Sequence, residues 1–121
     1  MRARGFTLIE VLVALAIVAV ALMASMRAVG VMALSGAELK MRLLAELSAR
    51  NEIALLRATK AFPALGITSA ACPQGDVAMV CREETKSTPN EFFRRVEVRV
   101  YLQSHPEQQL AELVGILPNE Q

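Results

Sequence analysis

The chain has 121 residues, of which 54% are hydrophobic and only 4% aromatic, and its formal net charge is +1. The length suits a single domain, but this apolar content with so few aromatic residues is unusual for a soluble one. Lysine and arginine are spread among acidic residues and form no basic stripe, so we expect no binding of nucleic acid through charge.

The apolar residues concentrate near the N-terminus. Residues 11–24 form an unbroken apolar run, and the wider segment 6–26 is interrupted only by Thr7, Glu10 and Ser25. At about 1.5 Å per residue, this segment makes a helix roughly 30 Å long, which is enough to cross the hydrocarbon layer of a bilayer. The sequence therefore predicts a membrane-spanning helix over residues 6–26.

A short basic stretch precedes this apolar segment. A secretory signal has its cleavage site on the far side of a shorter apolar region, whereas here Arg2, Arg4 and Gly5 all stand before it. The positive-inside tendency places the N-terminus in the cytoplasm and sends the rest of the chain outward.

Glu10 is a carboxylate inside the predicted span. A charge there costs a few kcal/mol unless it is paired or reaches the interface. Two explanations stand: Glu10 stays hydrated near the cytoplasmic surface, or it meets a buried positive charge on another subunit.

Residues 5–10 read GFTLIE and are followed by the apolar run VLVALA. This pattern resembles the class III signal of type IV prepilins and type II secretion pseudopilins. The resemblance implies that a prepilin peptidase removes residues 1–5 by cutting between Gly5 and Phe6, and methylates the new amine of Phe6. It also implies that Glu10 pairs with the Phe6 amine of a neighbouring subunit during assembly.

Residues 27–59 keep helical periodicity: Leu39, Leu43 and Leu47 recur at a spacing of four, and most charged residues lie off that stripe. The stripe is extended by Leu44, Leu47, Ile53 and Leu56. We expect one helix over residues 6–59, whose periplasmic half, 27–59, buries this leucine stripe against the following domain. Gly30 and Gly36 either soften the helix or admit a closely packed neighbouring backbone.

Residues 60–121 are expected to form a small head. Breaker residues and a turn-rich loop occupy residues 60–76, strands are expected at 77–82, 95–102 and 110–117, and a turn at 104–109. Alternation in the second strand predicts one apolar sheet face, which the periplasmic half of the helix would cover. The expected fold class is α+β, type IV pilin-like, with a long helix on a small antiparallel sheet.

Cys72 and Cys81 are the only cysteines. An even count behind a membrane segment favours a disulfide in an oxidising compartment over a reduced buried pair. A zinc site would need further ligands, and the single histidine, His105, is distant in sequence. The bond would close a loop of about ten residues and contribute about 2 to 3 kcal/mol, which matters for so small a head.

Three head segments carry a narrower resemblance: ARNEIALL at 49–56, FPALG at 62–66 and FRRVEVRV at 93–100. They resemble the minor pseudopilin family called type II secretion system protein I, although the cysteine pair and the lack of tryptophan depart from its pattern. The resemblance implies a place at the tip of the pseudopilus with the H, J and K subunits and the major pseudopilin. Such a subunit spans the inner membrane once, keeps its head in the periplasm, and helps to start assembly for export of folded proteins.

We expect neither catalysis nor a cofactor or metal. Ser104 and His105 are adjacent, but neighbours on an extended segment point in different directions, and Glu83 with Glu84 fits solvated turn charges better than a cation site. One alternative is a minor pilin that primes a type IV pilus. Another is a single-span anchor holding a small binding module, which would need neither cleavage at Gly5 nor Glu10. A secreted enzyme is disfavoured, because no far-side cleavage site or catalytic cluster is present.

Overall fold

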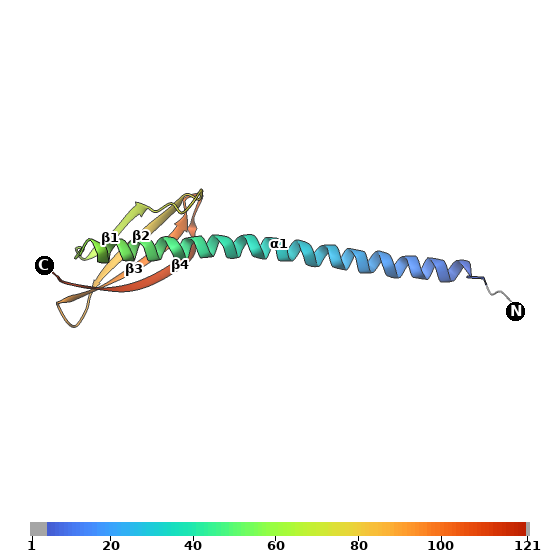
Figure 1. Cartoon of the computed structure of the whole chain (residues 1–121), viewed down its shortest axis with the longest axis horizontal. Helices are drawn as coiled ribbons and strands as arrows, with labels where there is room; N and C mark the ends of the chain where they lie inside the picture. The colour runs from blue at the N-terminus through green and yellow to red at the C-terminus, as the bar shows by residue number, and fades with distance from the viewer. Residues whose placement is uncertain (1–4, 121) are drawn as a thin grey trace. The chain divides into compact units, whose positions relative to one another are not determined.

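The computed structural model describes residues 5–120 of the chain (Figure 1). Within them, one helix is followed by four β-strands: α1 (Leu8–Ala58), β1 (Gly66–Ala71), β2 (Met79–Ser87), β3 (Phe93–Leu102) and β4 (His105–Pro118). A long helix followed by an antiparallel sheet is the α+β class that the sequence predicts. One uninterrupted helix was expected over residues 6–59, and it runs from Leu8 to Ala58, so that Phe6 and Thr7 precede it.

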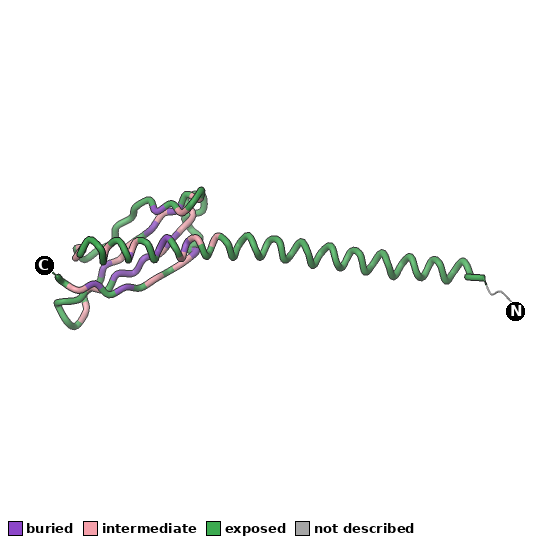
Figure 2. Tube along the Cα trace, in the orientation of Figure 1, coloured by how far each residue is buried: buried purple, intermediate pink, exposed green. Residues whose placement is uncertain are grey.

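The chain divides into two compact units, Met1–Glu38 and Leu39–Gln121, and α1 runs through both. The apolar side chains of the first unit are exposed, which Figure 2 shows as an unbroken green tube. An 18-residue window of α1 has a mean hydropathy of 2.6, and none of that window is buried within the chain. The helix is therefore long and apolar enough to cross a membrane.

Gly30 and Gly36 both lie inside α1. A Cβ built at either position meets no described atom within 4 Å, the adjacent helix backbone aside. Close approach of another part of this chain therefore does not explain the two glycines. A local softening of the helix stays a prediction.

The second unit contains a four-stranded antiparallel sheet in the order β1-β2-β3-β4. The three-strand expectation was wrong, because β1 occupies a segment that we read as loop. The polar residues after Cys81 continue β2 as far as Ser87, and β4 begins at His105 inside the expected turn. These segments carry polar side chains on the sheet face that points away from α1. The alternation of apolar and polar residues that identifies a strand is therefore not apparent in their sequences.

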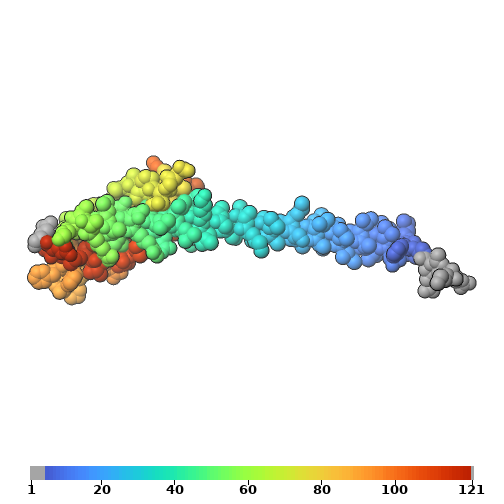
Figure 3. All heavy atoms as spheres, viewed as in Figure 1, coloured from blue at the N-terminus to red at the C-terminus, as the bar shows by residue number. Residues whose placement is uncertain are grey.

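The core of the second unit lies between α1 and one face of this sheet. Figure 2 shows the buried segments on the strands and on the helix turns that cross them. The largest fully buried side chains are Met79, Leu117, Val96, Val98, Val100 and Cys81. In the space-filling view of Figure 3, atoms of β4 and of the segment around the β1–β2 connection lie directly against α1.

The expected apolar stripe of the helix is buried only in part: Ile53 is buried and Leu44 and Leu56 pack against the core, whereas the leucines nearer the N-terminus stay exposed. Leu39, Leu43 and Leu47 are 58%, 53% and 48% exposed. Besides Ile53, the helix buries three small residues that were not on the expected stripe, Ala45, Ser48 and Ala49. Small side chains let the helix axis approach the sheet closely, whereas a row of leucines would hold it farther away. Periodicity predicted the helix correctly and its buried face in part, because it included Ile53 and missed the small residues Ala45, Ser48 and Ala49.

The helix ends in a Schellman motif. The Lys60 amide donates to the Arg57 carbonyl at 3.1 Å, and the Ala61 amide donates to the Leu56 carbonyl at 2.9 Å. Lys60 has a φ of 52°, the left-handed conformation that this motif requires. The segment between α1 and β1 is held by Arg94, whose guanidinium lies 4.1 Å from the centre of the Phe62 ring.

Candidate functional site

The candidate processing segment stands directly before the helix. Gly5, Phe6 and Thr7 are not helical, and Phe6 is 84% exposed. The Glu10 amide donates to the Thr7 carbonyl at 3.1 Å and also lies 3.3 Å from the Thr7 hydroxyl oxygen. Thr7 is thus the N-cap of α1, and the Gly5–Phe6 bond lies outside the helix. The rest of the expected leader, residues 1–4, lies outside the described residues.

Sequence reasoning overlooked the role of Thr7. Threonine followed three residues later by glutamate is the signature of a capping box, and the GFTLIE segment contains it. The cap fixes where the helix begins and leaves the expected cleavage bond in non-helical backbone. It also satisfies the Glu10 amide, which would otherwise be an unpaired donor at the helix end.

Glu10 lies in the first turn of α1. Its side chain shares a shallow, largely apolar hollow of about 420 Å³ with Phe6, Val11, Ala14, Leu15 and Val18. Among the described residues Glu10 forms no ion pair. A positive partner for its carboxylate would have to come from elsewhere, as the second explanation of this residue requires.

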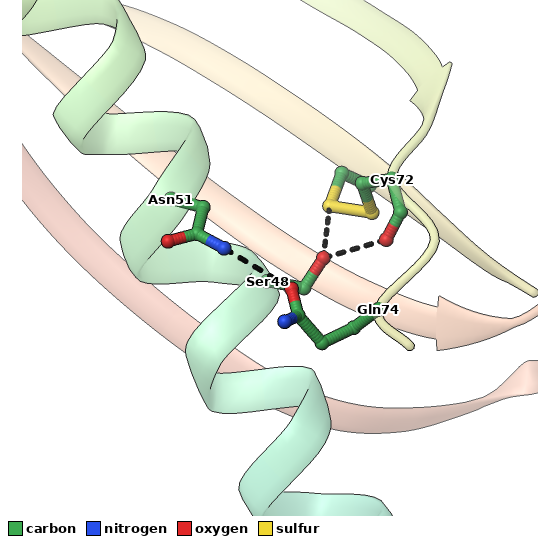
Figure 4. Close-up of a disulfide and its surroundings, with 5 residues drawn as sticks. Ser48, Asn51, Cys72 and Gln74 are labelled. Atoms are coloured by element: carbon green, nitrogen blue, oxygen red, sulfur yellow. Dashed lines mark hydrogen bonds between the residues drawn. A yellow bond between two sulfur atoms is a disulfide. The ribbon is translucent and has the colours of Figure 1, made fainter. Parts of the chain in front are cut away.

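The two cysteines form a disulfide between the end of β1 and the start of β2, as the sequence predicts. The Cα atoms of Cys72 and Cys81 are 5.7 Å apart, and the two residues are 4% and 1% exposed. Figure 4 shows the bond close to Ser48 of α1. The pair is therefore a buried part of the contact between helix and sheet.

An ionic network covers the sheet face that points away from α1. Its centre is the buried side chain of Glu97, which lies 3.2 Å from Lys86, 3.1 Å from Arg95 and 2.9 Å from Arg99. Arg99 extends the network to Glu84 at 3.2 Å. The hydrogen bond from Lys86 and the neighbouring positive charges lower the pKa of Glu97. This network stabilises a charged sheet face.

Glu83 and Glu84 lie on opposite faces of β2, because successive strand residues alternate. Glu84 joins the ionic network, whereas Glu83 faces α1 and Glu52. Burial, then the charge of Glu52 and a hydrogen bond to it, raise the pKa of Glu83. The two glutamates therefore do not make a joint cation site. In residues 5–120 no group of three or more His, Cys, Asp or Glu side chains is placed to hold a metal.

Ser104 and His105 lie at the exposed turn between β3 and β4. The Ser104 hydroxyl is 2.9 Å from Nδ1 of His105. Across the described part of the chain, no carboxylate contacts the ring to orient it as a catalytic base would require. The pair shows no arrangement for nucleophilic catalysis.

Two comparisons with known families decide the assignment. Residues 39–118 match the model of the family type II secretion system (T2SS), protein I, and residues 1–26 match the prokaryotic N-terminal methylation motif. The first match covers more than half of the chain. The chain belongs to the type II secretion system protein I family. The comparison with curated proteins found no match.

Family membership confirms the resemblance carried by the head segments and the type IV pilin-like fold class. Protein I is a structural pseudopilin family, so the role of this chain is pseudopilin-like. The methylation motif ends within the apolar part of α1. Together, motif and helix indicate a single-pass membrane anchor carrying a small α+β head.

Proposed function

We propose that this protein is a minor pseudopilin of the type II secretion system. It acts in the tip complex with the H, J and K subunits and contacts the major pseudopilin below them. The complex starts assembly of the pseudopilus, which serves export of folded proteins across the outer membrane. The anchor lies in the inner membrane, with its N-terminus in the cytoplasm and the head in the periplasm.

The observation that carries this proposal is the order of the two family matches along one chain. A methylation motif at 1–26 supplies the processed anchor, and a protein I head follows at 39–118. A generic membrane anchor would need neither feature. The buried disulfide supports a periplasmic head, because disulfides persist in oxidising compartments.

The N-terminal residues have distinct roles in this proposal. The prepilin peptidase cuts between Gly5 and Phe6, and methylates Phe6. Removal of residues 1–5 creates an amine within reach of a neighbouring subunit, and Glu10 pairs with that amine. Pairing removes most of the cost of a carboxylate in the membrane, and a misplaced neighbour would not provide it. Glu10 thereby selects the correct register between subunits.

Co-isolation after crosslinking in the cell tests the assembly role. The full chain should be recovered with the H, J and K pseudopilins, and Glu10→Gln, which keeps the size of the side chain and removes its charge, should still be cleaved but recovered with them far less. Glu38→Gln is the matched control outside the apolar segment and should leave recovery unchanged. Recovery with type IV pilus subunits instead would support a minor pilin, and recovery with neither would leave only an anchored module.

A further inference from the structure

One turn of α1 contacts both the disulfide and the loop that it closes. The Ser48 hydroxyl donates to the Cys72 carbonyl at 2.6 Å and lies 3.9 Å from Sγ of Cys81. Nδ2 of Asn51 donates to Oε1 of Gln74 at 3.1 Å. Figure 4 shows both helix side chains directed at the segment that carries Cys72 and Gln74. The disulfide ring is thus held on the helix by two side-chain hydrogen bonds.

The ring itself is a compact turn. In addition to the disulfide, a backbone hydrogen bond closes the ring: the Cys72 amide donates to the Met79 carbonyl at 3.0 Å. Gln74 and Val77 exchange two backbone hydrogen bonds of 3.1 Å and 3.2 Å. Gly75 has a φ of 58°, which a residue with a side chain rarely adopts. Closing this turn presents Gln74 to Asn51.

Apart from its backbone pairing with β2, β1 has few contacts that keep it in place. All six of its residues are exposed, so it contributes no buried side chain to the core. It is an edge strand, and within the sheet it pairs only with β2. A segment without buried apolar contacts belongs to the low-stability part of a fold. The pairing with β2 and the disulfide just beyond the end of the strand are therefore its main attachments.

We propose that the Cys72–Cys81 pair is a local redox latch. In the oxidised state it fixes β1 and the β1–β2 loop, residues 66–78, on α1. Reduction releases this segment while α1 and strands β2 to β4 keep their packing. Most of the core lies outside residues 66–78, in Met79, Val96, Val98, Val100 and Leu117 with the helix, whereas this segment adds only Cys72 and the partly buried Val77.

Closure of the latch is an ordinary thiol–disulfide exchange. One cysteine thiolate attacks a disulfide oxidant and forms a mixed disulfide, and the second thiolate then displaces the oxidant from it. The two thiols lose two protons and two electrons in total, and the oxidant takes these up as its disulfide is reduced to two thiols. Oxidised glutathione serves as the probe and yields two molecules of the reduced tripeptide. Dithiothreitol drives the reverse reaction.

Hydrogen exchange of the full chain in detergent micelles tests the latch. Amides of residues 66–78 should lose protection when the protein is reduced with dithiothreitol, and β3 and β4 should keep theirs. Reoxidation with glutathione disulfide should restore the original pattern. Unchanged protection of residues 66–78 on reduction would overturn the proposal, and so would loss of protection over the whole head.

The rate of reduction supplies a second test, which does not depend on a cysteine variant. Both sulfurs are buried, so dithiothreitol reaches them only after the segment opens. Ser48→Ala and Asn51→Ala each remove one hydrogen bond from the latch and should speed reduction by about fivefold.

Leu117→Ala is the matched control. This residue is buried in β4, away from the latch, so the substitution destabilises the whole head without touching residues 66–78. It should leave the reduction rate close to that of the unmodified protein. Equal acceleration by Leu117→Ala and Ser48→Ala would mean that reduction needs global unfolding, and the local latch would be wrong.

Discussion

Ile53 of α1 and Gly115 of β4 pack so closely that a methyl group at Gly115 would crowd the Ile53 side chain. A Cβ built on Gly115 would lie 3.0 Å from Cγ2 and 3.1 Å from Cδ1 of Ile53. Both contacts are shorter than ordinary van der Waals separation. The absence of a side chain at Gly115 lets Ile53 lie directly against β4.

We predict that Gly115→Ala lowers the free energy of unfolding of the head by about 1–3 kcal/mol, because the added methyl overpacks the contact. Hydrogen exchange of β3 amides in the full chain measures this value. Gly36→Ala is the control, since a methyl there meets no described neighbour. In an Ile53→Ala background, Gly115→Ala should be close to neutral. An equal cost with and without Ile53 would show that the contact does not limit the approach.

Substitutions on the exposed and the buried face of α1 should differ in their effect on the stability of the head. Leu43 is 53% exposed, and Leu43→Ala should change the stability of the head by less than about 1 kcal/mol. Ala49 is fully buried, and Ala49→Leu should cost about 1–3 kcal/mol or more, because the helix would be pushed from the sheet. Urea-induced unfolding of both full-length variants checks the order. A larger loss from Leu43→Ala would restore the leucine stripe as the buried face.

The sequence allowed the helix, the central strands and the disulfide to be predicted, because each rests on a local pattern. Val96, Val98 and Val100 alternate with polar residues, and Cys72 with Cys81 is the only possible pair. The buried helix face was predictable only in part, through Ile53. Ala45, Ser48 and Ala49 look unremarkable in a hydropathy pattern, and their burial follows from the distance between helix and sheet.

The N-terminal site was predicted mainly from the resemblance of its residues to a known motif, and less from the physical properties of those residues. Glu10 is conspicuous in an apolar segment, but its expected partner lies on another subunit, which one chain does not contain. Thr7 could have been recognised from its spacing to Glu10. The latch contacts of Ser48 and Asn51 join residues far apart in sequence, so no local pattern points to them.

Glu83 gives the head an unusual pH dependence. Its pKa is raised above the ordinary 4.5 by burial and by Glu52, so the folded state holds this proton more tightly than the unfolded state. Its contribution to stability is present at pH below the ordinary value and is lost as pH rises through the raised pKa. Glu83→Gln should therefore stabilise the head at about pH 7 and give little gain near about pH 4. Urea unfolding across that range measures the difference, and a gain independent of pH would contradict the assignment.

Glu97 should act in the opposite direction. The hydrogen bond from Lys86 and the charges of Arg95 and Arg99 lower its pKa, so the folded state favours the carboxylate. Its stabilising contribution is present above the ordinary pKa and is lost as pH falls through the lowered value. Glu97→Gln should destabilise the head at neutral pH, and the loss should shrink in acid. The same urea series tests it, and equal destabilisation in acid would show that packing, not charge, explains the effect.

The assignment as a processed pseudopilin depends most directly on its N-terminus. We would measure the intact mass and N-terminal sequence of the membrane-bound protein from cells with and without prepilin peptidase. The account predicts a chain that begins at methylated Phe6 only when the peptidase is present. A chain that still begins at Met1 in the presence of the peptidase would contradict it.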